Sequence, residues 1–577
     1  MTSTIVERGD HLRPAARPRM GRAAAGMAAW LPLLLVLAFA VLWPLVNFEL
    51  QSFAGGLKSY EDAFGAPGFV RSVLVTFALA FADVIFAIVL GTALAWCALH
   101  LPRRWQSFGS LVPLMPLLVP GVAAAAGWIF LLSPRAGYLN TIIRWVSGNE
   151  DASRAPFNIY SFSGMVFVSG LIFTSFIFMF VHNGLRNTGG EYEEAAAVAG
   201  ASPLRSFFTV TLPQLRPSLA YGAGIVFMLA LGQFSAPVLL GVPARIDVLT
   251  TRMFAMLENY PVAFGEVAAI GMPLLLAGIV IAAIQRWVIG DMRRYVTIGG
   301  RAQYSPRKPK ASAAVWIALF GIVAVVLPLL ALLYAALSPY WTQTMTFSNL
   351  TTRHFVAALS NQNLLNGIKT SLIASATTIM IVLPAGYWAA MIVTGRIRSP
   401  WWVLRVLDIL LLLPFAVPAT LYGFALLFAY SHPPFALYGT QAIIVVAYAT
   451  IMVPYSTRVL VSALIAFGPE PWEASAICGA GPVRTFVRIT LPLMRRSAGV
   501  AAVMVFILLF QEFAVSLLVR SASVQVVGGV LYDQYVAGSY PGVAVVALLM
   551  VAMTAIGVTI MTAAGGAEAL KGTGGRR

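Results

Sequence analysis

The sequence predicts an all-α integral membrane protein with about twelve transmembrane helices, arranged as two tandem halves of six. Three observations lead to this fold class. Hydrophobic residues make up 59% of the 577 residues and charged residues only 10%, whereas soluble domains are about 45–50% apolar. Apolar stretches repeatedly reach the roughly 20 residues that a helix needs to cross a hydrocarbon core of ~30 Å. A charged segment also occurs twice, at a constant interval (473 − 194 = 279).

Each apolar stretch is expected to be a helix, because lipid offers no partners for backbone polar groups. The expected spans of the first half are 27–48, 74–97, 111–132, 164–181, 219–240 and 267–289. Those of the second half are 313–337, 368–393, 404–429, 442–464, 498–519 and 543–564. The resulting domain division is a tail at 1–26, a first domain at 27–290, a linker at 291–312, a second domain at 313–566 and a tail at 567–577.

Lys and Arg gather in the loops of one parity, and such residues resist translocation across the membrane. The N-terminal tail and the 291–312 linker are both rich in them. The distribution therefore predicts that both termini face the cytoplasm. It also accounts for the net charge of +17 through insertion and contact with anionic lipid, so no nucleic-acid partner is expected.

The repeated segments lie at about 188–213 and 467–492, in loops assigned to the cytoplasm. They read EAAAVAGASPLRSFFTVTLP from Glu194 and EASAICGAGPVRTFVRITLP from Glu473. Acidic residues in an opening turn favour a helix start, and a glycine six residues after the glutamate suits a left-handed helix end. Each segment therefore predicts two short helices around a tight turn. A Leu-Pro pair is expected to break the second helix before the chain enters the bilayer.

The duplication extends beyond these loops. FMLALGQFSAPVLL from Phe227 aligns with FILLFQEFAVSLLV from Phe506, again 279 residues apart. Six spans per half make the repeats parallel, related by an axis along the membrane normal, with any shared path between them. Upstream, Pro116 and Pro120 match Pro414 and Pro418. Paired prolines should bend or break their helices, either as tolerated packing kinks or because these helices line the path.

The repeated loops resemble the EAA signature of permease subunits of bacterial ABC importers, in which a short coupling helix docks on a separate ATPase subunit. The resemblance implies the type I importer fold, with two permeases fused in one chain of the inner membrane. Its expected partners are two copies of the ATPase, which bind ATP and Mg, and an external solute-binding protein. The implied coupling residues are Glu194, Ala195, Ala196, Gly200, Leu212, Pro213, Glu473, Ala474, Ser475, Gly479, Leu491 and Pro492.

The fused form and the GQFSAPVLLG segment from Gly232 look most like the ferric-iron permeases. The same group includes thiamine, polyamine and phosphonate importers, which stay open as alternatives. Another class, a gradient-driven transporter with twelve helices, would suit two parallel halves but not the EAA loops. A channel or membrane scaffold explains neither loop.

Several chemistries are not expected. The chain has no GxxxxGK[ST] segment and no arrangement of nucleophile and base, so no enzyme activity and no cofactor are predicted for it. Its five histidines are scattered without metal-ligand spacing, and no metal site is predicted.

Polar residues inside spans are costly and are candidates for function. They include Asp83 and Asp408, besides those proposed to line the path. The expected path residues are Gln233, Phe234, Ser235, Gln511, Glu512 and Phe513. Gln233 and Glu512 are equivalent in the two repeats, each before a phenylalanine that could belong to a gate. The alternative is that the polar groups form interhelical hydrogen bonds.

Overall fold

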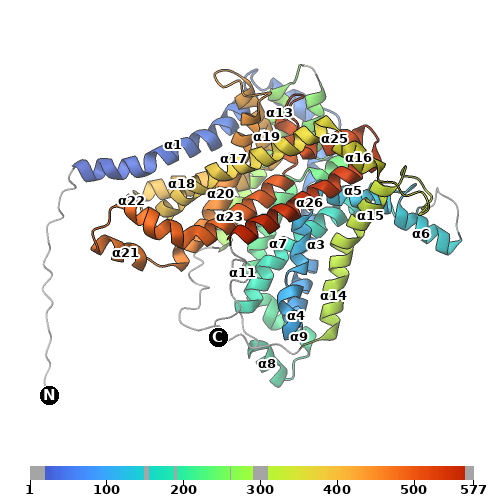
Figure 1. Ribbon diagram of the computed structural model, residues 1–577, viewed down its shortest axis with the longest axis horizontal. Coiled ribbons are helices and arrows are strands. Elements are labelled where there is room, and N and C mark those ends of the chain that lie inside the picture. Colours follow the sequence, from blue (N-terminus) through green and yellow to red (C-terminus); the bar gives the residue numbers. More distant parts are fainter. Residues whose placement is uncertain (1–19, 149–154, 188–190, 260, 290–308, 566–577) are drawn as a thin grey trace.

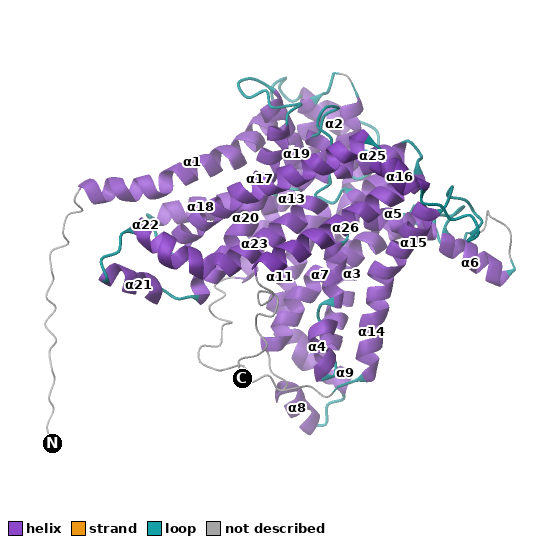
Figure 2. Cartoon of the chain, in the orientation of Figure 1, coloured by secondary structure: helices purple, strands orange, loops and turns teal. Residues whose placement is uncertain are grey.

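The computed structural model describes residues 20–148, 155–187, 191–259, 261–289 and 309–565. The C-terminal tail, and most of the N-terminal tail and of the 291–312 linker, fall outside these ranges. Within them the chain forms helices joined by short loops, without a strand (Figure 2). Nine helices are long and apolar enough to cross a membrane, and counting two bent pairs as spans gives eleven. The predicted fold class is confirmed.

The long helices follow the expected spans. In the first half they are α1 (Met20–Gln51), α3 (Phe69–Leu99), α7 (Phe162–Asn187), α11 (Arg216–Leu231) and α13 (Phe264–Ile289). In the second half they are α14 (Ala311–Gly321) continued by η6 (Ile322–Val326) and α15 (Leu327–Leu337), then α17 (Gln362–Val393), α20 (Gln441–Ala466), α23 (Leu491–Gln511) and α26 (Tyr540–Gly565). Shorter helices include α2 (Lys58–Gly65), α4 (Arg103–Gly109), α6 (Tyr138–Ser147), α12 (Leu249–Ala255), η4 (Met256–Glu258), α16 (Arg353–Leu359) and α25 (Val527–Val536).

The proline pairs divide two spans, as the sequence predicts. η1 (Val112–Leu118) and α5 (Gly121–Leu132) meet at an angle of 102°, and α18 (Trp401–Ala416) and α19 (Ala419–Ser431) at 108°. In both pairs the second proline immediately precedes the new helix, where its missing N–H costs nothing.

The expected spans 219–240 and 498–519 are also divided, which the sequence does not predict. α11 ends at Leu231, and the chain turns before η3 (Pro237–Gly241). α23 ends at Gln511 and α24 (Ala514–Val519) follows. In the second case the carboxylate of Glu512 accepts the backbone N–H groups of Val515 and Ser516 at 2.8 and 2.7 Å. A side chain thus replaces the helical partners of these donors.

The halves exchange their first helices. α1 packs on α19, where the Tyr422 hydroxyl donates to the Val41 carbonyl at 2.9 Å. Reciprocally, α15 packs on α5, and a Cβ added to Gly127 would lie 2.7 Å from the carbonyl oxygen of Pro328. Figure 1 shows blue α1 running beside α17 and α18 of the second half. The first span of each half is therefore buried against the other half, and the two halves form one body.

Matched hydrogen bonds reveal the internal repeat in three dimensions. Thr76 on α3 accepts the backbone N–H of Leu249 at 2.9 Å, and Ser371 on α17 accepts that of Val527 at 3.1 Å. The acceptors are 295 residues apart (371 − 76) and the donors 278 (527 − 249). α3 and α17 thus occupy equivalent places, each holding the short helix that follows its half's divided span.

Candidate functional site

The first EAA loop has the predicted architecture. α8 (Glu191–Val198) begins with acidic residues and ends at Gly200, whose φ is +83°. The backbone N–H groups of Gly200 and Ala201 donate to the carbonyls of Ala197 and Ala196 at 3.0 and 2.9 Å. This pattern is the left-handed cap expected from the sequence. α9 (Pro203–Ser206) follows, and Ser202 Oγ caps it by accepting the Arg205 N–H at 3.4 Å.

The second EAA loop repeats this geometry. α21 (Glu470–Ile477) ends at Gly479 with φ +72°, and the Ala480 N–H donates to the Ser475 carbonyl at 3.1 Å. α22 (Pro482–Thr485) follows the turn. Figure 1 places α8 and α21 on the same lower-left side of the molecule, away from α2 and α25.

The Leu-Pro pairs do not act as the sequence suggested. Each comes after a π-turn, at Phe207–Thr211 (η2) and Phe486–Thr490 (η7). In the second half the helix continues through Pro492 to Gln511. In the first it passes Pro213 in α10 (Leu212–Gln214) and is interrupted only at Leu215. Wide turns avoid the clash between a proline ring and the carbonyl four residues earlier, so the predicted break is wrong.

The small residues of the signature serve two purposes. Ala195 and Ala474 are exposed, as docking would require. Ser475 is buried, and its hydroxyl lies 2.7 Å from that of Thr485 on the second short helix. A small side chain at this position therefore lets the two helices of the loop pack on each other.

The two loops close the same internal contact with different chemistry. In the first, Thr211 donates to the carboxylate of Glu193 at 3.1 Å. In the second, the Trp472 indole donates to Thr490 at 3.0 Å, at positions again 279 residues apart. The guanidinium of Arg396 lies 4.2 Å from the centre of the Trp472 ring and donates to the Leu464 and Gly468 carbonyls. Burial lowers the pKa of Arg396.

Each loop presents one aliphatic side chain almost entirely to solvent. Val198 is 91% exposed and Ile477 is 87% exposed, and the two are equivalent in the repeat (477 − 198 = 279). Glu194, Glu473, Gly200 and Gly479 are exposed beside them. Exposed apolar groups at matched positions are typical of a surface that binds another protein.

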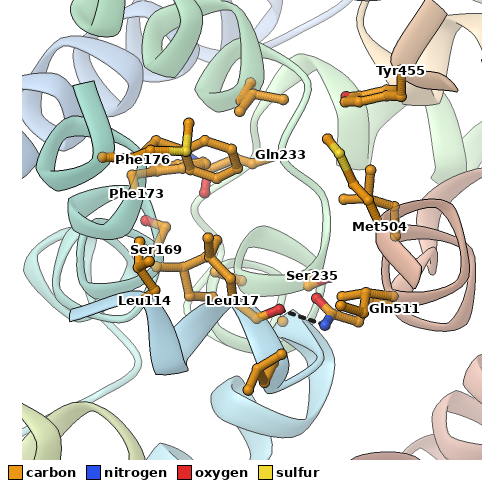
Figure 3. A pocket seen from close by; sticks show the side chains of 18 of the residues that line it. Leu114, Leu117, Ser169, Phe173, Phe176, Gln233, Ser235, Tyr455, Met504 and Gln511 are labelled. Atoms are coloured by element: carbon orange, nitrogen blue, oxygen red, sulfur yellow. Dashed lines mark hydrogen bonds between the residues drawn. The ribbon is translucent and has the colours of Figure 1, made fainter. Parts of the chain in front are cut away.

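A cavity of about 620 Å³ lies between the halves (Figure 3). Leu114 and Leu117 of η1, Phe173 and Phe176 of α7, and Met504 of α23 form much of its apolar wall. The polar groups in its lining are few: Ser169, Gln233, Ser235, Tyr455 and Gln511. η1 belongs to a span that its prolines divide, so this broken helix does line the space between the halves.

A second cavity of about 480 Å³ adjoins the first and shares Phe176, Met179, Leu229, Tyr455 and Met504 with it. Its other lining residues include Asp408, Phe415 and Arg458. Arg458 lies 4.9 Å above the Phe415 ring and donates to the Tyr221 hydroxyl at 3.4 Å. Tyr221 and Arg458 stand near the helix ends that lead to the EAA loops, so the two spaces continue towards that side of the protein.

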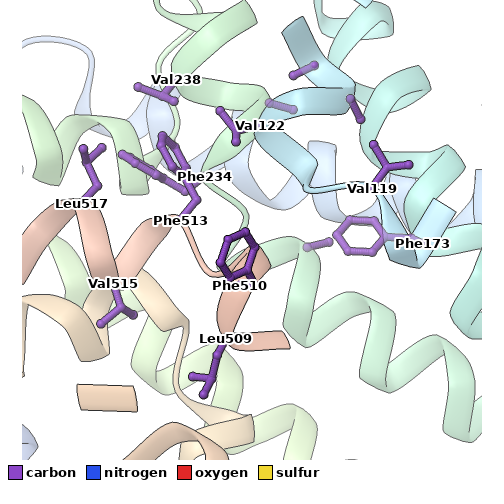
Figure 4. Close-up of a cluster of buried hydrophobic side chains, with 14 of the residues drawn as sticks. Val119, Val122, Phe173, Phe234, Val238, Leu509, Phe510, Phe513, Val515 and Leu517 are labelled. Carbon is purple, nitrogen blue, oxygen red and sulfur yellow. The ribbon is translucent and has the colours of Figure 1, made fainter. Parts of the chain in front are cut away.

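Aromatic rings pack beyond the first cavity, on the side away from the EAA loops. The ring centres of Phe234 and Phe513 are 5.7 Å apart, and both side chains are buried (Figure 4). Phe254 of α12 packs on Phe234, and Tyr532 of α25 packs on Phe513. The rings come from equivalent positions (513 − 234 = 279 and 532 − 254 = 278), so both halves contribute equally to this cluster.

The predicted path residues occupy three environments. Gln233, Ser235 and Gln511 line the cavity, with Phe234 and Phe513 in the aromatic cluster. Glu512, which the alignment pairs with Gln233, instead caps α24. A helix break follows Gln511, and its neighbour's carboxylate turns to the next helix. The assignment of all six to a translocation path stays a prediction.

Sequence reasoning missed Ser169, Tyr455 and Met504 as lining residues. Their helices are apolar throughout, so the sequence carries no signal that singles out these positions. The sequence identifies Asp83 as an intramembrane acid but does not indicate its partners. In the structure its carboxylate accepts from Ser169 Oγ at 2.7 Å and from Gln233 Nε2 at 2.6 Å.

A helical membrane protein with two parallel halves, a cavity between them and two matched loops on one side has the construction of a solute permease. The chain belongs to the family of binding-protein-dependent transport system inner membrane components, whose sequence profile matches residues 87–294 and again 382–565. The two matches confirm that two permease domains are fused.

Two relatives resemble the chain across both domains. It is 25% identical to the ferric transport system permease protein FbpB of Actinobacillus pleuropneumoniae, over 92% of this chain and 77% of that protein. It is also 25% identical to the putative ferric transport system permease protein FbpB 1 of Haemophilus influenzae, over 81% of this chain and 74% of that protein. The sulfate transport system permease protein CysT of Salmonella typhimurium is 27% identical over only 40% of this chain.

Proposed function

We propose that this chain is the membrane-spanning subunit of an ABC importer that takes up ferric iron. The similarity to ferric permeases over both fused domains carries the proposal. A sulfate permease matches over a much smaller share of the chain. Thiamine, polyamine and phosphonate import remain the alternatives for the same machinery.

The proposed mechanism is alternating access. Two copies of a cytoplasmic ATPase bind the EAA loops, and ATP draws these loops together. The two halves then tilt, so that the aromatic cluster opens to a binding protein on the outer face, and hydrolysis restores the inward arrangement. The exposed Val198 and Ile477 support this assignment, because each gives an ATPase surface an apolar contact. Both termini would lie in the cytoplasm with the loops.

The test is uptake of ⁵⁵Fe(III) by membrane vesicles that contain the full chain, its ATPase and an iron-loaded binding protein. ATP inside the compartment that bears the loops should drive uptake, and dissipating the proton gradient should leave it unchanged. Competition by thiamine, spermidine or a phosphonate, without iron uptake, would reassign the solute. Gradient-driven uptake by vesicles that hold the chain alone would overturn the importer assignment.

A further inference from the structure

The polar groups of the cavity between the halves have an unusual bias. Glutamine side chains carry both N–H donors and a carbonyl acceptor, so two glutamines could offer either kind of group to a solute. In this cavity the donors of both are already used by the protein. Gln233 Nε2 donates to Asp83 Oδ2 at 2.6 Å, and Gln511 Nε2 donates to the backbone carbonyl of Leu117.

The partners determine which way each amide points. A backbone carbonyl can only accept, and so can an ionised carboxylate. The amide nitrogens must therefore face Leu117 and Asp83, and the amide oxygens are left for the cavity. Figure 3 shows the Gln511 oxygen directed away from its dashed bond to Leu117. Gln233 Oε1 is buried and has no hydrogen-bond partner among the described residues, which costs about 1–3 kcal/mol until a donor arrives.

The remaining lining does not restore the balance. The cavity is lined by apolar groups, by hydroxyls that both donate and accept, and by the two glutamines, with no Lys, Arg or His among the described lining residues. Arg458 stands in the adjoining cavity, but Asp408 lines that space too. An anion would find no free amide N–H group or positive charge in the first cavity. A cation, or the outward-pointing hydrogens of its hydration shell, would find two oxygens.

The second half reaches a related arrangement by another route. The interval of 295 residues that relates α3 to α17 places Thr378 where the first half has Asp83 (378 − 83 = 295), and Glu512 stands where it has Gln233. The first half therefore has an acid on the third helix and an amide at the break. The second half has a hydroxyl on the corresponding helix and the acid at the break. Each half places one carboxyl group beside the cavity.

From these contacts the geometry points to a charge filter within the permease: Asp83 and the Leu117 carbonyl hold two glutamine amides so that the cavity displays oxygen acceptors and admits cations in preference to anions. Asp83 is a positioning residue that acts through Gln233. The inference deepens the proposed function, on which it rests, by assigning part of the solute selection to this chain, in addition to any external binding protein.

The test uses the full chain in membrane vesicles and needs no ATPase, binding protein or iron. A single cysteine replaces Met504, which lines both cavities and is 37% exposed. Cys97 and Cys478 are changed to Ala and Ser. The probes are two methanethiosulfonate reagents of similar size, one bearing a trimethylammonium group and one a sulfonate, each rate being divided by that with a free thiol. The cationic reagent should react faster by about tenfold or more. Equal rates, or faster reaction of the sulfonate, would overturn the filter.

Substitutions at Asp83 test the positioning role. Asp83→Asn offers Gln233 a donor, so its amide can turn and present N–H groups to the cavity, and the preference for the cationic reagent should fall severalfold. The double variant Asp83→Asn with Gln233→Glu mimics the second half and should restore the preference. If Asp83 only supports folding, both variants would change the two rates together and leave their ratio unaltered. A preserved filter without iron uptake would refute the iron assignment alone.

Discussion

The glycines that end the first helix of each EAA loop allow a prediction whose size follows from the structure. Gly200 and Gly479 have φ of +83° and +72°, and a Cβ added to either would meet no atom within 4 Å. The cost of a side chain there is therefore conformational, about 1–2 kcal/mol for an ordinary residue and more for a β-branched one. At about 1.4 kcal/mol per factor of ten, each loop with valine should populate its native turn roughly 5–30 times less.

The variant to make is Gly200→Val with Gly479→Val, and its matched control is Gly200→Asn with Gly479→Asn. Asparagine has a similar size but adopts the left-handed region far more readily. Both variants should insert and unfold at the same temperature as the parent, since the loops lie outside the helical bundle. In vesicles with the ATPase, the valine variant should lose ATP-driven uptake at least tenfold while hydrolysis continues, and the asparagine variant should retain most uptake. Equal uptake per ATP in the two variants would refute the reasoning.

Three further predictions concern the loop surface, the aromatic cluster and the exchanged helices. Val198→Asp with Ile477→Asp should weaken ATPase binding by at least 2 kcal/mol in a pull-down titration, at about 1–2 kcal/mol per lost apolar contact, and unchanged affinity would show that these residues do not touch the partner. Phe234→Ala with Phe513→Ala removes two buried rings, and it should let a small solute such as ⁵⁵Fe(III) citrate leak across vesicles without ATP; tight vesicles would argue against a closing role. Gly127→Ala should lower stability by about 1–3 kcal/mol because its Cβ would lie 2.7 Å from the Pro328 carbonyl oxygen, whereas Gly55→Ala, with open space around it, should not; thermal unfolding in detergent, followed by tryptophan fluorescence, measures both.

Much of the fold is predictable from the sequence because the signals are local. The length of an apolar run decides whether a helix crosses the bilayer, and the glycine at 200 or 479 needs only its own backbone angle to end a helix. The proline pairs at 116/120 and 414/418 likewise act on their own helices. These features repeat at fixed intervals, so the amino-acid sequence alone reveals the internal duplication.

The candidate site is only partly predictable, as the pair Gln511 and Glu512 shows. Sequence reasoning assigns both to the path because both are polar within an apolar span. The side chains of adjacent residues point in different directions at a helix break, so only one lines the cavity and the other caps the next helix. The break predicted at the Leu-Pro pairs is wrong for a related reason, since a wide turn depends on the hydrogen-bond register of the helix.

Hydropathy, turn residues and spacing are enough to establish a duplicated helical membrane permease with two matched loops on one side, because each of these signals acts through neighbours in the chain. The packing of distant segments adds three facts: the first helices are exchanged, four rings from both halves pack together, and Asp83 holds Gln233 across 150 residues. Those contacts depend on which faces of distant helices meet, and almost uniformly apolar helices carry little pattern that identifies the face turned inward.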